Sequence, residues 1–86
     1  MTETLDANEV TLFVVPNCPL CTDARAWLAR HGVAYVERDV KRDFGALREM
    51  YRLTRQNLVP VFARGTRALV RPTDAQLKDF LVNGKW

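Results

Sequence analysis

The sequence predicts an α/β domain in which a four-stranded mixed sheet is flanked by three helices, in the order β-α-β-α-β-β-α. The main observations are an apolar strand-like run at residues 10–15, a change to helical spacing directly after it, and two short apolar runs around a glycine turn between residues 61 and 70. A chain of 86 residues with 48% hydrophobic residues fits one small globular domain. We assign this domain to residues 10–86 and treat residues 1–9 as an N-terminal extension whose order or disorder the sequence leaves open.

The first half of the domain has the pattern of a strand-helix-strand unit. Residues 10–15 are mostly β-branched or aromatic, and from Leu12 onward they have apolar side chains on both faces, which predicts a central strand covered on both sides. Residues 33–40 form the second strand-like run, and a unit of this length implies a right-handed parallel crossover. Between them, Gly32 ends a predicted helix. The apolar positions of that helix recur at spacings of three and four: Leu20, Ala24, Trp27, Leu28 and His31.

The second half of the domain contains two further helices and a hairpin. Asp43 can cap one helix, and Thr73 followed by Gln76 has the form of a capping box for the other. Between them, two short apolar runs flank Gly65, a spacing that predicts a β-hairpin. The predicted apolar stripes are Phe44, Leu47, Met50 and Tyr51 in the first of these helices and Leu77, Phe80 and Leu81 in the second.

Charge and composition narrow the classes of partner. The net charge of +3 comes mainly from scattered arginines without a stripe of interleaved aromatic residues, so we expect no nucleic-acid partner. An arginine subset near Arg52, Arg55 and Arg71 could still steer acidic partners. Residues 1–9 lack the pattern of a signal peptide, and no apolar run approaches membrane-spanning length. We therefore expect a soluble cytoplasmic protein with no membrane partner, and a monomer, since nothing in the sequence forces a dimer.

The chemistry of the chain is concentrated in its two cysteines, Cys18 and Cys21. A pair at this spacing at the start of a helix can alternate between a dithiol and a disulfide. Cys18 would lie near unpaired backbone N–H groups and the positive end of the helix dipole, which favour the attacking thiolate. Cys21, one turn further on, is the expected resolving thiol. Pro19 suits the first helical position, whereas Asp23, interpreted as a first-turn carboxylate, opposes activation of Cys18.

Two other interpretations of the cysteine pair stay open at this point. A zinc site needs four ligands, but the chain offers one histidine, His31, and no second cysteine pair, so we expect no metal. Two cysteines can also be plain apolar core residues without redox chemistry. His31 itself is better explained as a helix-end residue that complements the dipole than as a catalytic base.

Two motifs at this spacing resemble the glutaredoxin-like branch of the thioredoxin superfamily, over about residues 10–82. Residues 14–21 are similar to the strand-to-CPYC segment of that family, and residues 58–61 to its Thr-Val-Pro element. The resemblance implies a thioredoxin-like fold and a cis Pro60 facing the dithiol. It also implies that the substrate contacts Pro19, Leu20, Val59 and Pro60. The residues alone would make Pro60 a trans proline at the start of a strand.

Three departures from the family pattern bear on the substrate. Val15 stands where glutathione-using members carry a lysine, Leu20 replaces a common tyrosine, and residues 70–74 lack the usual pair of glycines before an acidic residue. We expect Arg71 and Thr73 to replace the lost contacts by binding a carboxylate, assisted by the N-terminus of the last helix, and we place Asp74 beside them among the substrate-binding residues. The alternative is that Arg71 is a surface residue and Thr73 only a helix cap.

The sequence thus predicts a thiol–disulfide oxidoreductase that reduces protein or low-molecular-weight disulfides. It needs no cofactor beyond the redox-active Cys18–Cys21 disulfide, and the resemblance implies glutathione or thioredoxin reductase as reductant, with ribonucleotide reductase as one candidate acceptor. The alternative is a non-catalytic thioredoxin-fold binding or redox-sensing module that grips a partner segment beside Val59–Pro60. An iron–sulfur scaffold is disfavoured, because the dithiol motif with Pro19 differs from the monothiol pattern of cluster-binding relatives.

Overall fold

The computed structural model describes residues 9–82, so most of the predicted N-terminal extension lies outside the described residues. The predicted order of strands and helices is confirmed. The strands are β1 (Val10–Val14), β2 (Tyr35–Asp39), β3 (Val61–Arg64) and β4 (Arg67–Val70), and the helices are α1 (Pro19–Arg30), α2 (Phe44–Thr54) and α3 (Asp74–Leu77), which continues as a π-helical segment over Lys78–Val82.

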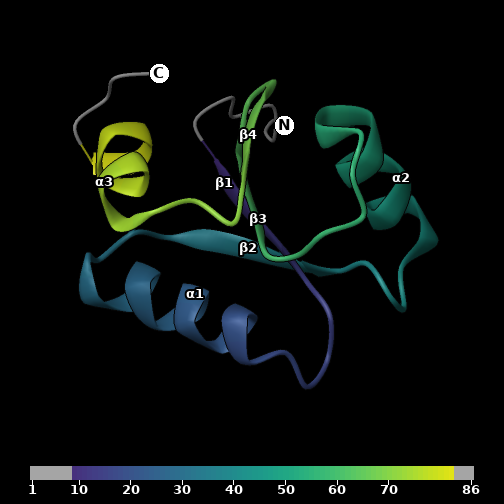
Figure 1. Cartoon of the computed structure of the whole chain (residues 1–86), viewed down its shortest axis with the longest axis horizontal. Coiled ribbons are helices and arrows are strands. Elements are labelled where there is room, and N and C mark those ends of the chain that lie inside the picture. The colour runs from purple at the N-terminus through teal and green to yellow at the C-terminus, as the bar shows by residue number, and fades with distance from the viewer. Residues whose placement is uncertain (1–8, 83–86) are drawn as a thin grey trace, which may run out of the picture.

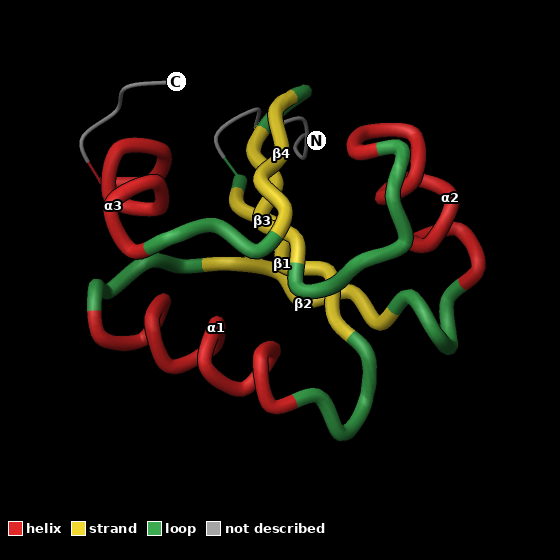
Figure 2. Tube along the Cα trace, viewed as in Figure 1, coloured by secondary structure: helices red, strands yellow, loops and turns green. Residues whose placement is uncertain are grey.

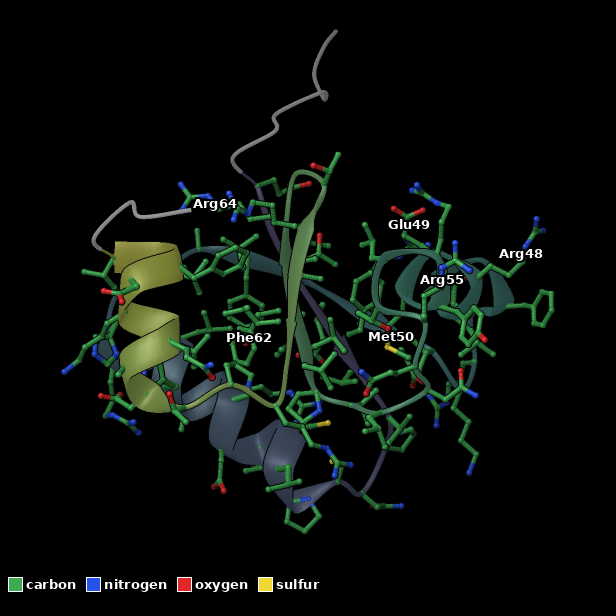
Figure 3. All side chains as sticks on the ribbon, turned by 45° about the horizontal axis from the view of Figure 1, so that its top comes forward. Arg48, Glu49, Met50, Arg55, Phe62 and Arg64 are labelled. Carbon is green, nitrogen blue, oxygen red and sulfur yellow. The ribbon has the colours of Figure 1, made fainter. Side chains whose placement is uncertain are left out.

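The four strands form one mixed sheet in the order β2-β1-β3-β4. β1 runs parallel to β2 and antiparallel to β3, and the β3–β4 hairpin completes the sheet. α1 and α3 lie on one side of the sheet and α2 on the other (Figures 1, 2 and 3). Because β1 is covered on both faces, Leu12, Phe13 and Val14 are all buried, as the continuous apolar pattern predicts.

α1 begins directly after Cys18, which is its N-cap, and ends at Arg30, followed by its C-cap His31 and Gly32. Gly32 has a φ of +64°, the left-handed conformation that glycine adopts without strain. The buried side chains of the helix are Cys21, Ala24, Trp27 and Leu28. Leu20, predicted to belong to this stripe, is instead 47% exposed and borders a surface pocket.

α2 is capped as predicted, since the Asp43 Oδ1 accepts a hydrogen bond from the Ala46 N–H at 3.1 Å. Its predicted apolar stripe is only half correct. Ala46 and Met50 are fully buried, whereas Phe44 and Tyr51 are 71% and 47% exposed. The face that meets the sheet is therefore centred on two residues four apart, Ala46 and Met50, and Figure 3 shows Met50 between α2 and the strands.

The C-terminal half follows the local signals closely. Gly65 lies in the hairpin turn between β3 and β4 with a φ of +64°. The Thr73 hydroxyl accepts from the Gln76 N–H at 3.1 Å, and the Gln76 side chain accepts from the Thr73 N–H at 2.8 Å, which is a complete capping box. Within residues 9–82, no helix is long and apolar enough to cross a membrane.

Candidate active site

The two thiols meet at the N-terminus of α1, where Cys18 is the N-cap and Cys21 lies one turn into the helix. The backbone N–H of Cys21 donates to the Cys18 Sγ at 3.2 Å, so the thiol sulfur takes the role that a serine or aspartate oxygen usually has at a helix start. Both cysteines are free thiols. Cys18 is half-buried, whereas Cys21 is fully buried, so an attacking reagent reaches Cys18 first.

The surroundings separate the two thiols electrostatically. Partial burial by itself would raise the pKa of Cys18, but hydrogen bonds from Cys21 and from the Leu20 backbone, together with the positive charge of Arg71, lower the pKa of Cys18 below its ordinary value. Burial, followed by the hydrogen bond to Cys18, raises the pKa of Cys21 to about 11. The thiolate therefore forms first at Cys18.

The expected opposition from Asp23 rests on a wrong placement. α1 begins at Pro19, and its first turn contains no acidic residue. Asp23 lies beyond that turn, where it lines the pocket beside Leu20 and Ala24. The cation that acts on Cys18 is instead Arg71, a role that the sequence analysis missed.

The Val59–Pro60 peptide bond is cis, so the cis geometry expected from the family resemblance is confirmed and a trans proline at the strand start is wrong. Val59 and Pro60 are both buried, directly before β3. Pro60 shares the wall of the pocket with Leu20. The structure thus brings α1 and the cis-proline loop to one surface.

Arg71 follows β4 and is tied to the same loop. Its Nε donates to the Val59 carbonyl oxygen at 2.8 Å, and its backbone N–H donates to the Pro60 carbonyl at 3.2 Å. The backbone of Arg71 has a φ of +46°, in the left-handed region that favours glycine. Arg71 is exposed, so the alternative of a surface residue is confirmed, but both its side chain and its backbone are bonded to the cis-proline loop.

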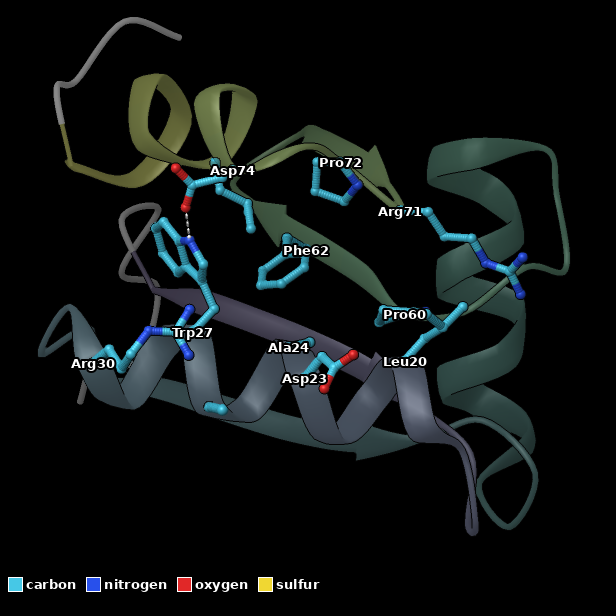
Figure 4. Close-up of a pocket in the computed structure, with 12 residues that line it drawn as sticks. Leu20, Asp23, Ala24, Trp27, Arg30, Pro60, Phe62, Arg71, Pro72 and Asp74 are labelled. Atoms are coloured by element: carbon cyan, nitrogen blue, oxygen red, sulfur yellow. Dashed lines mark hydrogen bonds between the residues drawn. The ribbon is translucent and has the colours of Figure 1, made fainter.

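A pocket of about 470 Å³ lies between α1 and the segment from Pro60 to Leu77. Its walls include the apolar side chains of Trp27, Phe62 and Pro72, with Arg71 at one end and Asp74 at the other (Figure 4). Trp27 and Phe62 were not assigned to the site from the sequence. Trp27 could have been found by its place on the same helix as the dithiol, but no local signal marks Phe62.

Thr73 and Asp74 lie at the start of α3, and both are engaged in contacts within the chain. The Thr73 hydroxyl caps the helix, as the alternative interpretation predicted. The Asp74 Oδ1 accepts from the Trp27 Nε1–H at 2.6 Å, and its Oδ2 lies 3.3 Å from the Lys78 Nζ. The hydrogen bond from Trp27, followed by the contact with Lys78, lowers the pKa of Asp74.

Comparison with known proteins gives a consistent family and fold. The glutaredoxin family model matches residues 10–67. Two solved structures are similar along most of their length. Glutaredoxin from Archaeoglobus fulgidus has a TM-score of 0.79 and 19% identity over 94% of this chain and 97% of that one. Glutaredoxin from Methanosarcina mazei has a TM-score of 0.79 and 18% identity over 94% and 84%. At these identities, the two structures support the thioredoxin-like fold alone.

One further match covers only a short part of the chain and is to a transcriptional regulator. The global transcriptional regulator Spx of Streptococcus agalactiae is 48% identical to this chain over 31 residues, which are 36% of this chain and 23% of the regulator. The chain therefore matches less than a quarter of the length of this curated relative.

Proposed function

The chain belongs to the glutaredoxin family, whose fold and dithiol support a thiol redox function, and we propose that it is a thiol–disulfide oxidoreductase using Cys18 and Cys21. The observation that carries this proposal is the difference between the two thiols. Cys18 is accessible with a lowered pKa, whereas Cys21 is buried with a pKa of about 11. A structural pair of core cysteines has no need of this asymmetry.

In the proposed reaction, the Cys18 thiolate attacks one sulfur of a substrate disulfide. The substrate S–S bond breaks, its other sulfur leaves as a thiolate that takes up a proton, and a mixed disulfide with Cys18 forms. Cys21 then loses its proton and attacks the Cys18 sulfur, which releases the second substrate thiol. Two electrons have passed to the substrate, and the protein holds a Cys18–Cys21 disulfide.

The high pKa of Cys21 suits this order of events. Part of the rise in the pKa of Cys21 comes from its hydrogen bond to Cys18 and from the Cys18 charge. Both effects disappear when Cys18 enters the mixed disulfide, so Cys21 becomes easier to ionise only when its attack is needed. Before that step, Cys21 stays a neutral hydrogen-bond donor that stabilises the Cys18 thiolate.

For the substrate, we propose contacts with Pro19, Leu20, Val59 and Pro60 around the dithiol. Exposed apolar side chains neighbour these residues in the sequence, since Leu20 follows Pro19 and is 47% exposed, and Leu58 precedes Val59 and is 44% exposed. These exposed leucines favour a polypeptide disulfide as the substrate, because apolar side chains of a polypeptide can cover them.

Charged groups of the substrate would meet the two ends of the pocket, where we propose that Arg71, Thr73 and Asp74 take part in binding (Figure 4). Thr73 and Asp74 are already engaged with Gln76, Trp27 and Lys78, so their contribution would be secondary to that of Arg71.

The reductant is proposed to be thioredoxin reductase or glutathione, and ribonucleotide reductase is one candidate acceptor. Val15 in place of a lysine and the lack of a glycine pair in residues 70–74 remove elements typical of glutathione-using members, which favours thioredoxin reductase. We further propose that the protein acts as a cytoplasmic monomer without a resident metal or nucleotide.

The decisive experiment measures how fast the oxidised protein is reduced by NADPH with thioredoxin reductase, compared with glutathione with glutathione reductase. The Cys18→Ser variant is the blank. We expect reduction by at least one system, with thioredoxin reductase the faster. If neither system reduces a correctly formed Cys18–Cys21 disulfide, the proposed activity is wrong.

A second candidate is a redox-sensing or binding module that grips a partner segment beside Val59–Pro60. The observation in its favour is the match of 31 residues to a protein named as a transcriptional regulator. A sensor would form its disulfide with oxidants but would not turn over repeatedly with a disulfide substrate, so multiple-turnover reduction of insulin separates the two candidates.

A further inference from the structure

Arg71 has a backbone conformation that its side chain does not favour. Its φ of +46° lies in the left-handed region, where a Cβ atom crowds the following carbonyl. Asn17 and Arg55 also have positive φ values, both 59°. An arginine in this region is retained only if its surroundings compensate, and the contacts of Arg71 supply that compensation.

The compensating contacts all reach the cis-proline loop. The backbone N–H of Arg71 donates to the Pro60 carbonyl at 3.2 Å, and its Nε donates to the Val59 carbonyl at 2.8 Å. One residue therefore binds the carbonyls of both partners in the cis peptide bond. The terminal guanidinium nitrogens make no hydrogen bond to the described residues, so their charge is not neutralised by a carboxylate there.

The position of that charge matters for the thiols. Cys18 is the N-cap of α1, Arg71 lines the same pocket as Leu20 two residues after Cys18, and the Arg71 charge lowers the pKa of Cys18. Arg25, the cation that acts on Cys21, is already paired with Glu37 at 2.8 Å. The two sulfurs are thus influenced by different arginines, and Arg71, which acts on the accessible thiol, has no carboxylate partner among residues 9–82.

We propose that Arg71 is a positioning residue of the dithiol site, which fixes the Val59 carbonyl through its Nε and thereby holds its guanidinium charge beside Cys18. This inference rests on the proposed oxidoreductase function for its biological meaning, but the geometry can be tested without turnover. The side chain combines two effects, a fixed loop and a fixed charge, and substitutions can separate them. Lysine keeps the charge without the Nε donor, methionine removes both, and glycine removes both while also relieving the backbone.

The experiment is the rate of Cys18 alkylation by iodoacetamide as a function of pH, with Cys18 identified by peptide mass mapping. Variants R71M, R71K and R71G are compared with the wild type. Arg55 provides a matched control, because it is also an exposed arginine with a φ of 59°, yet it caps the C-terminus of α2. R55M therefore removes one arginine from the same backbone conformation without touching the cis-proline loop.

We expect R71M and R71G to move the alkylation midpoint upward by roughly 0.5 to 1 pH unit, with a rate at pH 7 roughly two- to threefold lower once the higher nucleophilicity of the more basic thiolate is included. R71K should keep a midpoint between those of R71M and the wild type, and R55M should leave it unchanged. An unchanged midpoint in both folded R71M and R71G overturns the proposal, as does an equal shift in R55M. R71G keeps the test valid if R71M fails to fold.

This measurement is independent of the proposed activity. If the wild type reduces no disulfide but R71M still shifts the alkylation midpoint, the proposed function fails while the role of Arg71 stands. If the wild type is an active reductase and the alkylation midpoint does not depend on Arg71, the proposed function stands while the role of Arg71 fails. The thermal midpoint of each variant, measured in parallel, shows whether a shift reflects loss of folding instead of loss of the charge.

Discussion

Native protein treated with limiting iodoacetamide at pH 7 should be alkylated at Cys18 and not at Cys21. The two thiols lie at the start of the same helix, but Cys18 is half-buried and Cys21 is fully buried. The pKa of Cys21 is about 11, whereas that of Cys18 is below the ordinary value of 9.0. Access and ionisation therefore favour the same cysteine.

The size of the preference follows from these pKa values. They differ by at least about two units, and each unit changes the thiolate fraction tenfold, so Cys18 has at least roughly 100 times more thiolate at pH 7. A thiolate of lower pKa is intrinsically less nucleophilic, with a Brønsted slope of about 0.5, which offsets roughly tenfold of this advantage. Ionisation alone then leaves a preference of about tenfold or more for Cys18, and burial of Cys21 increases it.

The assay alkylates the folded protein with limiting reagent, labels the remaining thiol in urea with a heavier reagent, and compares the two cysteine-containing peptides by mass. The control performs the first alkylation in urea, where the preference should fall towards unity, because burial and the helix N-terminus are both lost. Equal labelling in the folded protein, or labelling of Cys21 first, would refute the assignment of Cys18 as the attacking thiol.

Three further predictions concern stability. Met50→Ala should lower the free energy of unfolding, measured in urea, by about 2–5 kcal/mol, because Met50 is fully buried. Phe44→Ala on the exposed face of the same helix should change it by less than about 0.5 kcal/mol. Similar values for the two variants would contradict the burial pattern. Thr73→Ala should lower the free energy of unfolding by about 1 kcal/mol through loss of the capping box, whereas Thr73→Ser should retain most of that stability. Equal stability of the two variants in urea unfolding would argue against the cap. The hydrogen bond from Arg25 lowers the pKa of Glu37, so its stabilising contribution is present above the unfolded-state pKa and is lost as the pH falls through the folded-state pKa. Glu37→Gln should therefore flatten the stability profile in acid, less so in 1 M salt, and a profile identical to the wild type would exclude this contribution.

The order of elements could be predicted because its signals are local. The Asp43 cap and the capping box of Thr73 each involve residues three apart, so the sequence contains both partners side by side. The exposure of Phe44 and Tyr51 could not be predicted in this way. Helical spacing defines a stripe, but which side of α2 turns to the sheet depends on the strands it packs against.

The candidate site likewise has one part that local sequence signals predict and another that depends on long-range packing. The Cys18–Cys21 arrangement follows from local spacing, and the structure confirms an accessible thiol followed by a buried one. The hydrogen bond from Trp27 to Asp74 joins residues 47 positions apart, and that from Arg71 to Val59 spans 12. Such contacts depend on how α1, the cis-proline loop and the start of α3 converge, which no local pattern specifies.

Arg71 shows how a departure from a family pattern can carry information of its own. Residues 70–74 lack the glycine pair that the resemblance leads one to expect, yet the backbone of Arg71 adopts a φ of +46°, in the region that favours glycine. The arginine side chain donates to the Val59 carbonyl, and its positive charge lowers the pKa of Cys18. Val15, meanwhile, leaves the strand before the dithiol without the lysine of glutathione-using members. The activating charge therefore comes from the loop after β4, at one end of the pocket, where it can act on Cys18 and on an approaching substrate together (Figure 4).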